Sequence, residues 1–283
     1  MISINTVTFG YKPKSKLFQD LTVTIEDGNI FGLLGRNGAG KTTILRLIGG
    51  LLFPDSGTVS VLGHEAGERR PDMLSKLMFV PEEPYLPKIS GGKYLSRYAN
   101  LYPDFDMDRF NESRKSFEFD LSDNLGELSY GQKKKFLLSF ALAANCQITL
   151  LDEPTNGLDI PAKSAFRKVL SGSIDETKTV IIATHQVRDI ELLIDPIIII
   201  EQSRIVFKRT AEEISKSMTV KLQEEMPKDS IYHEKVFGGY AVLERNDGDR
   251  EENIDLELLF NAVTSNPDGM NEIFTKEEHT NGE

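Results

Sequence analysis

Residues 35–42 read Gly35-Arg36-Asn37-Gly38-Ala39-Gly40-Lys41-Thr42. The stretch matches the pattern of a glycine, any four residues and then Gly-Lys-Thr. It follows an apolar run at residues 29–34 that is typical of a buried parallel strand. The three glycines permit backbone angles that direct several amide N–H groups at one phosphate, and a helix beginning near Lys41 adds its positive dipole end. The pattern predicts a phosphate-binding loop, with Lys41 on the β- and γ-phosphates and Thr42 on Mg²⁺.

A second stretch with phosphate-binding chemistry reads Leu128-Ser129-Tyr130-Gly131-Gln132. Ser129 and Gln132 match a helix capping box, and a capped helix start exposes N–H groups that can also bind a γ-phosphate. One chain needs only the first stretch for one nucleotide. The second therefore predicts two chains that close face to face over nucleotide. The next residues, Lys133, Lys134 and Lys135, are expected to form a solvated helix face without a catalytic role.

Length and composition indicate a globular protein with one large domain and an appendage, or two modest domains, because the 283 residues are 39% hydrophobic. The longest aliphatic run, residues 197–200, is much shorter than a membrane-spanning helix, and the N-terminal residues lack a signal-peptide pattern. The only cysteine, Cys146, is expected to be a buried structural thiol. A cytoplasmic location is the resulting expectation.

The net charge of −11 is concentrated at the C-terminus, where residues 247–283 hold eleven carboxylates against Arg250 and Lys276. The rest of the chain is nearly neutral. Duplex binding depends largely on neutralising phosphates with basic residues, so the absence of a basic stripe argues against nucleic acid as a partner. The acidic segment is interpreted as a solubilising tail.

Hydrophobic patterning predicts a sheet with helices. Residues 21–25 and 58–61 alternate between apolar and polar, as antiparallel strands with one wet face do. Four short apolar runs are expected as parallel strands covered on both faces: residues 77–80, 148–151, 180–183 and 197–200.

The segments between and after these runs have other patterns. Residues 83–145 have helical periods and predict a mainly helical insert. After Arg209, a separate tail is expected to contain a strand at residues 236–244. It should also contain a helix that ends before Asn266, with one apolar face formed by Leu256, Leu259, Phe260 and Val263.

Polar residues follow several of the predicted parallel strands, at the edge of the sheet where ligands bind. Asp152 and Glu153 follow the run at 148–151; we assign Asp152 to the Mg²⁺ shell and Glu153 to polarising the attacking water. His185 is expected to contact a γ-phosphate oxygen or orient that water, and Tyr11 to stack on adenine. The structural alternatives are an acidic pair capping a loop, a satisfied polar histidine and a tyrosine flanking a strand.

These segments resemble the nucleotide-binding domain of ABC transporters over residues 1–210, with the motifs in the family's order. The resemblance pairs each segment with a motif: Tyr11 with the adenine-stacking aromatic, 35–43 with Walker A, 128–132 with the signature, Asp152 and Glu153 with Walker B, 156–159 with the D-loop and His185 with the switch histidine. The signature is the most specific, because other P-loop proteins share Walker A but lack it. The implied fold is α/β, a P-loop NTPase with a mostly parallel core sheet, an N-terminal antiparallel β subdomain, a helical insert at about 83–145, and a small acidic α+β extension at 211–283.

The resemblance also implies which residues form the site. Contacts with ATP are expected from Tyr11, Gly35, Asn37, Gly38, Ala39, Gly40, Lys41, Thr42, Thr43, Glu82, Ser129, Gly131, Gln132 and Asp159. Catalysis is expected from Glu153, His185 and Lys41, and Mg²⁺ binding from Thr42, Glu82 and Asp152.

The sequence departs from the family's pattern at two positions. Glu82 stands where the Q-loop usually has glutamine, which resembles a subset of drug-resistance-type exporter subunits; a carboxylate can ligate magnesium but cannot donate a hydrogen bond. Tyr130 replaces the first glycine of the signature, whereas Gly131 is retained for close approach to phosphate.

The function implied is that of an ATPase subunit peripheral to the cytoplasmic face of the cell membrane. It would pair with a second ATP-binding subunit, identical or not, in a head-to-tail sandwich and drive a separately encoded membrane subunit. Export is favoured over import because Leu256-Glu257-Leu258-Leu259-Phe260 resembles a helix face found in C-terminal extensions of such exporters. The alternatives are a soluble ABC ATPase, for example in cofactor assembly, and another P-loop enzyme such as a small-molecule kinase or GTPase, although no Asn-Lys-x-Asp guanine box is present.

Overall fold

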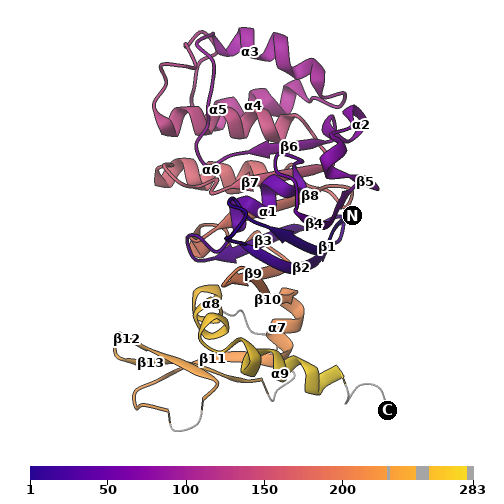
Figure 1. Cartoon of the computed structure of the whole chain (residues 1–283). Helices are drawn as coiled ribbons and strands as arrows, with labels where there is room; N and C mark the ends of the chain where they lie inside the picture. The colour runs from indigo at the N-terminus through magenta and orange to yellow at the C-terminus, as the bar shows by residue number, and fades with distance from the viewer. Residues whose placement is uncertain (228–229, 247–254, 279–283) are drawn as a thin grey trace.

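The computed structural model describes residues 1–227, 230–246 and 255–278 and is built on a central six-stranded sheet of order β10-β9-β3-β8-β7-β6 (Figure 1). The strands of this sheet are β3 (Ile30–Gly35), β6 (Leu77–Val80), β7 (Ile148–Asp152), β8 (Thr179–Thr184), β9 (Ile197–Glu201) and β10 (Arg204–Arg209). All pairs are parallel except β9 with β10. The four apolar runs are thereby confirmed as parallel strands.

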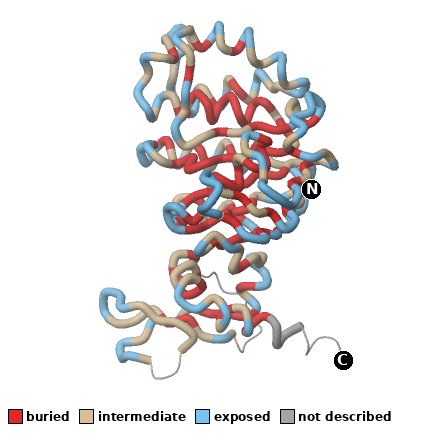
Figure 2. The backbone as a smooth tube through the Cα atoms, in the orientation of Figure 1, coloured by how far each residue is buried: buried red, intermediate tan, exposed pale blue. Residues whose placement is uncertain are grey.

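Both faces of this sheet are buried, which explains why its strands are apolar at almost every position. In β8, Ile181 and Ala183 enter one hydrophobic core, whereas Val180 and Ile182 enter the other. Successive side chains of a strand point to opposite faces, so the two cores share the same short runs. Figure 2 shows this buried interior as the red segments of the tube.

One face is covered by helix α1 (Lys41–Ile48) and a four-stranded antiparallel sheet of order β2-β1-β4-β5. The elements of this N-terminal region are β1 (Ile2–Phe9), β2 (Phe18–Ile25), β4 (Ser56–Val61), β5 (His64–Glu65), the 3-10 helix η1 (Ala66–Glu68) and α2 (Pro71–Leu74). Along β2, Leu21, Val23 and Ile25 are buried and the residues between them are exposed. The expectation of antiparallel strands with one wet face is confirmed.

The other face is covered mainly by helices between β6 and β8. They are α3 (Gly91–Tyr98), η2 (Ala99–Leu101), α4 (Met107–Phe117), α5 (Tyr130–Ala143) and α6 (Ile160–Ser171), followed by η3 (Val187–Asp189) after β8. Phe136 and Phe140 of α5 lie in the same core as Leu151 of β7. The predicted helical insert between β6 and β7 is confirmed, and Cys146 is buried as expected.

The elements after β10 lie at one end of the molecule (Figure 1). They are α7 (Ala211–Ser217), β11 (Met218–Gln223), β12 (Tyr232–Val236), β13 (Gly239–Arg245), α8 (Leu256–Ser265) and α9 (Pro267–Glu278). Helix α8 ends before Asn266 as predicted, but its buried face also includes Leu258 and Ala262, while Phe260 is only half-buried. The helix packs against both the core sheet and η3, which widens its buried face.

The strand predicted at residues 236–244 is confirmed as β13 over residues 239–244, but its predicted start is wrong, because Val236 ends the preceding strand, β12. The chain turns at Phe237 and Gly238, so the apolar segment is divided between β12 and β13 of a hairpin. Gly238 has φ 84°, a left-handed conformation that glycine adopts without the steric cost of a side chain. The acidic segment at 247–283 lies partly outside the described residues. Within the ranges described, every helix is too short or too polar to cross a bilayer.

Candidate functional site

The glycine-rich segment connects β3 to α1, as the sequence predicts. Gly38 and Gly40 have φ values of 83° and 112°, which non-glycine residues rarely adopt. Gly40 precedes the first turn of α1, and a Cβ there would lie 2.5 Å from the ring of Phe18. The loop therefore requires glycine for both its conformation and its packing, and it leaves the free N–H groups of α1 at the sheet edge.

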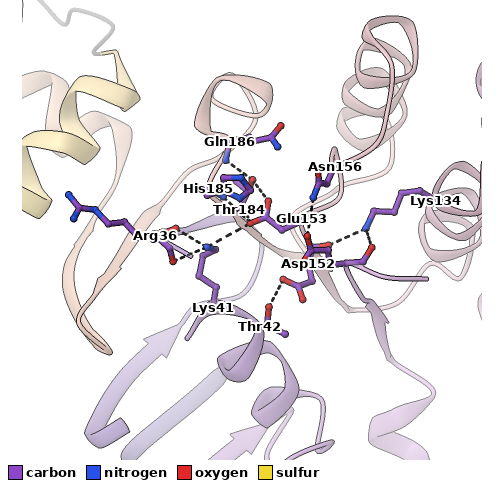
Figure 3. A network of polar contacts seen from close by, with 12 residues as sticks. Arg36, Lys41, Thr42, Lys134, Asp152, Glu153, Asn156, Thr184, His185 and Gln186 are labelled. Carbon is purple, nitrogen blue, oxygen red and sulfur yellow. Dashed lines mark hydrogen bonds and ion pairs between the residues drawn. The ribbon is translucent and has the colours of Figure 1, made fainter. Parts of the chain in front are cut away.

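Lys41 is only 6% exposed and lies inside this loop (Figure 3). Its Nζ donates hydrogen bonds to the carbonyl oxygens of Gly35 at 2.7 Å and Arg36 at 3.3 Å. Burial lowers the pKa of Lys41, and the charges of Glu153 and Asp152 oppose that shift. The N–H groups of this ammonium can donate hydrogen bonds to phosphate oxygens.

Asp152 ends β7 and is 1% exposed. Thr42 Oγ1 donates to its Oδ1 at 3.0 Å. Burial raises the pKa of the Asp152 carboxyl, and the hydrogen bond from Thr42 acts in the opposite direction. A buried carboxylate beside a hydroxyl is an oxygen donor set of the kind that Mg²⁺ prefers.

Glu153 is held by the end of β8 (Figure 3). Its Oε2 accepts from Thr184 Oγ1 at 2.8 Å, and its Oε1 accepts from the His185 backbone N–H at 3.1 Å. The same Oε1 lies 2.7 Å from His185 Nδ1 and 3.7 Å from Lys41 Nζ. Glu153 itself has φ 44°, an uncommon conformation for a residue with a side chain and one that clusters at functional sites.

Glu82, just after β6, points its carboxylate toward the segment that follows Walker B. Asn156 Nδ2 donates to Glu82 Oε1 at 2.9 Å. Sequence reasoning assigned individual roles to neither Asn156 nor Thr184. Asn156 lies within the D-loop segment, and this position could have indicated a role at the site. Thr184 is one of several threonines at strand ends, so its position in the sequence does not indicate such a role.

Most of these groups line one pocket of about 680 Å³, a size typical of small-molecule sites; Asp152 and Thr184 do not line it. The predicted residues that line it are Tyr11, Asn37, Gly38, Gly40, Lys41, Thr42, Thr43, Glu82, Glu153 and His185. Tyr11 is 59% exposed at its rim, and its hydroxyl lies 2.9 Å from Thr43 Oγ1. Asp152 lies behind the lining and is linked to it by the hydrogen bond from Thr42, which does line the pocket.

Ser129, Gly131, Gln132 and Asp159 are absent from the lining of this pocket. Ser129 and Gln132 form the predicted capping box of α5. Asp159 accepts from Ala162 N–H at 2.8 Å and caps α6. The role predicted for these four residues, contact with ATP, remains a prediction; for the signature residues Ser129, Gly131 and Gln132 this ATP would be held by another chain.

Lys134 contradicts the expected solvated helix face. Its side chain is fully buried, and Nζ donates to the backbone oxygens of Pro81 at 3.1 Å, Glu82 at 2.8 Å and Asp152 at 3.3 Å. Burial lowers the pKa of Lys134 to about 8. A run of three lysines does not indicate that the middle one is buried against two strand ends. Its burial depends on how α5 packs on the sheet.

The buried ammonium group predicts a specific pH dependence of stability. Between about pH 8 and pH 10.5 the folded chain has lost a proton at Lys134 that the unfolded chain still binds. The free energy of unfolding should therefore rise with pH in this window relative to that of Lys134→Met, which has no such group. Urea unfolding of both proteins across the window measures the difference; a difference that stays constant with pH would contradict the prediction.

Comparisons with known proteins agree with this geometry. The family described as ABC transporter matches residues 18–156. The ABC transporter ATP-binding protein YtrB of Bacillus subtilis (strain 168) is 33% identical over 211 residues, covering 74% of this chain and 72% of YtrB. The SkfA peptide export ATP-binding protein SkfE of the same organism is 31% identical over 194 residues, covering 66% of this chain and 80% of SkfE.

Solved structures show the same fold. The ATP-binding subunit of an ABC transporter superposes with a TM-score of 0.66 at 23% identity, over 74% of this chain and 90% of that one. A dimeric ATP-binding cassette bound to ADP and Pi superposes with a TM-score of 0.64 at 23% identity, over 74% of this chain and 98% of that one. The phosphate-binding loop, Glu153 and His185 line one pocket, and the matching relatives carry the same family description. The chain belongs to the ATP-binding subunits of ABC transporters, which bind and hydrolyse ATP.

Proposed function

We propose that this chain hydrolyses Mg-ATP at the interface of two ATP-binding subunits and thereby drives export through a separately encoded membrane subunit, from the cytoplasmic face of the membrane. Members of the family work with membrane subunits and dimerise. The observation that carries the proposal is the arrangement around Glu153, which is 5% exposed, held by Thr184 and His185, and 3.7 Å from Lys41 Nζ.

This arrangement supports hydrolysis because each group has a defined task. The hydrogen bonds from Thr184 and the His185 backbone orient the Glu153 carboxylate, which polarises the attacking water and accepts its proton. Lys41 and the N–H groups at the start of α1 stabilise charge on the phosphates. His185 lines the same pocket, and there it would contact a γ-phosphate oxygen or that water.

Mg²⁺ fits the oxygen donors of the pocket. We propose that the Thr42 hydroxyl and the carboxylates of Asp152 and Glu82 hold it together with phosphate oxygens. The buried Asp152 carboxyl supports this assignment, because a cation would stabilise its ionised form. When bound, Mg²⁺ neutralises negative charge on the nucleotide.

The division of the chain proposed here falls at residue 210. Thr210 caps α7 with a complete capping box, and all the proposed ATP contacts precede it. Residues 1–210 would form the ATP-binding domain and 211–283 a small α+β extension. The similarity to a peptide-export subunit supports outward transport; ATP-dependent accumulation of cargo inside inverted membrane vesicles tests the direction.

The helical insert and the loop at residues 82–87 are the proposed contact with the membrane subunit, and Tyr85 of this loop is 92% exposed. Tyr85→Glu is expected to lower recovery of the chain with that subunit by about tenfold, since buried tyrosines often dominate interfaces. Its affinity for a fluorescent ATP analogue should not change. Co-purification from detergent-solubilised membranes measures the effect.

Leu222→Glu is the matched control, because Leu222 is 79% exposed on β11 of the C-terminal extension. It should co-purify like the unsubstituted chain. Full recovery of Tyr85→Glu would contradict docking through this loop. If the unsubstituted chain never associates with membranes in its host, the soluble ABC ATPase becomes the better assignment.

A further inference from the structure

Helix α5 places two side chains against one backbone oxygen of the nucleotide site. Tyr130 Oη donates to the carbonyl oxygen of Glu82 at 2.8 Å, and Lys134 Nζ donates to the same oxygen at 2.8 Å. The two residues are four apart and therefore share a helix face, and Lys134 Nζ lies 5.9 Å from the centre of the Tyr130 ring.

The carbonyl groups bound by Lys134 come from two neighbouring strands. Pro81 and Glu82 follow β6, Asp152 ends β7, and the two strands pair in parallel through Val80 and Leu151. Beyond the end of a ladder such carbonyls need other donors, and an ammonium group has three. Lys134 thus hydrogen-bonds the ends of both β6 and β7, including the carbonyl oxygen of Glu82, a residue of the pocket lining.

The Tyr130 ring packs closely against Gly157 of the D-loop. A Cβ on Gly157 would lie 2.3 Å from the Tyr130 ring, and Gly157 has φ 76°. A Cβ on Gly131 would lie 2.7 Å from the carbonyl oxygen of Gly157. The tyrosine ring therefore packs between α5 and the D-loop, with 39% of Tyr130 exposed, and its hydroxyl donates to the Glu82 carbonyl oxygen.

We propose that Tyr130 and Lys134 are positioning residues, which hold the backbone of Glu82 so that its carboxylate is placed in the pocket for Mg-nucleotide. The proposal rests on the proposed function, since it assigns Glu82 a role in binding Mg-ATP. Fixing the main chain at residue 82 from one side and the carboxylate through Asn156 from the other leaves Glu82 little freedom.

Equilibrium binding of a fluorescent ATP analogue, with saturating Mg²⁺ and with EDTA, tests this in the full chain. The ratio of the two affinities measures what Mg²⁺ contributes. Lys134→Met is expected to reduce that ratio by about tenfold, and Tyr130→Phe by a smaller factor in the same direction, because outer groups that orient metal ligands have effects of this order. Affinity in EDTA should stay near that of the unsubstituted chain.

Lys133→Met is the matched control: the same substitution one position earlier on α5, where the side chain makes none of the three hydrogen bonds to Pro81, Glu82 and Asp152. It should keep the original ratio. A merely structural role would lower the melting temperature of Lys134→Met and Tyr130→Phe without changing their ratios, and that result overturns the proposal.

Tyr130→Phe removes a single hydroxyl, so it decides the question if Lys134→Met does not fold: a reduced ratio supports the proposal and an unchanged ratio overturns it. The outcome also separates this inference from the proposed function. If the unsubstituted chain fails to bind the analogue, both are wrong. If it binds with a clear Mg²⁺ contribution that both variants retain, only the positioning role is wrong.

Discussion

Glu153→Gln is expected to reduce ATP turnover by at least about a hundredfold while ATP binding is retained, because removing a general base typically costs that much or more. Glutamine has nearly the same size as Glu153 and keeps one oxygen that can accept from Thr184 or His185. It cannot take a proton from water. ATP should therefore bind and close the pair of chains, but the step that opens the pair should not occur.

Phosphate release measures the first effect, and light scattering after size-exclusion chromatography in Mg-ATP measures the second. The trapped species should have the mass of two chains. Glu83→Gln is the control, because Glu83 is an exposed carboxylate next to Glu82 and lies outside the pocket lining. Persistent monomers of Glu153→Gln at saturating Mg-ATP, or turnover close to that of the unsubstituted chain, would show that Glu153 does not have this role.

Mixing Lys41→Ala with Ser129→Arg is expected to recover about a quarter of the original turnover, although each variant alone is nearly inactive. Lys41→Ala removes the ammonium group inside the phosphate loop. Ser129→Arg puts a long side chain at the start of α5, where a γ-phosphate from the partner should bind. Random pairing makes half the dimers mixed, and each mixed dimer has one complete site.

Titrating one variant into the other at constant total protein tests this arrangement. Activity should rise to a maximum at equal amounts and fall on either side. The control titrates each variant with more of itself, which should change nothing. If activity is only the weighted mean of the two variants at every ratio, each site lies within a single chain and the head-to-tail arrangement is wrong.

Much of the fold was accessible from local pattern. The phosphate loop could be identified because the requirement for positive φ at Gly38 and Gly40 is a property of those positions alone. The parallel strands could be identified because burial on both faces removes polar residues from short runs. Asp152 and His185 were placed at one edge since carboxyl ends of parallel strands meet there.

One error came from contacts between distant segments, and another came from a local turn. Lys134 lies in a run of three lysines, and only the packing of α5 against the ends of β6 and β7 makes the middle one fully buried. The strand expected at 236–244 begins only at Gly239, since Gly238 permits a turn inside an apolar segment and Val236 belongs to the preceding strand.

The sequence by itself determined the loop, the order of the strands and helices along the chain, and the residue types delivered to the sheet edge, because these follow from periodicity and from the backbone angles that glycine allows. Only the tertiary structure decided which polar groups meet. The pairing of Glu82 with Asn156, and of its carbonyl with Tyr130 and Lys134, joins segments 48 to 74 residues apart. Hydrogen bonds between such segments depend on where packing places each backbone, and a local sequence pattern does not predict this placement.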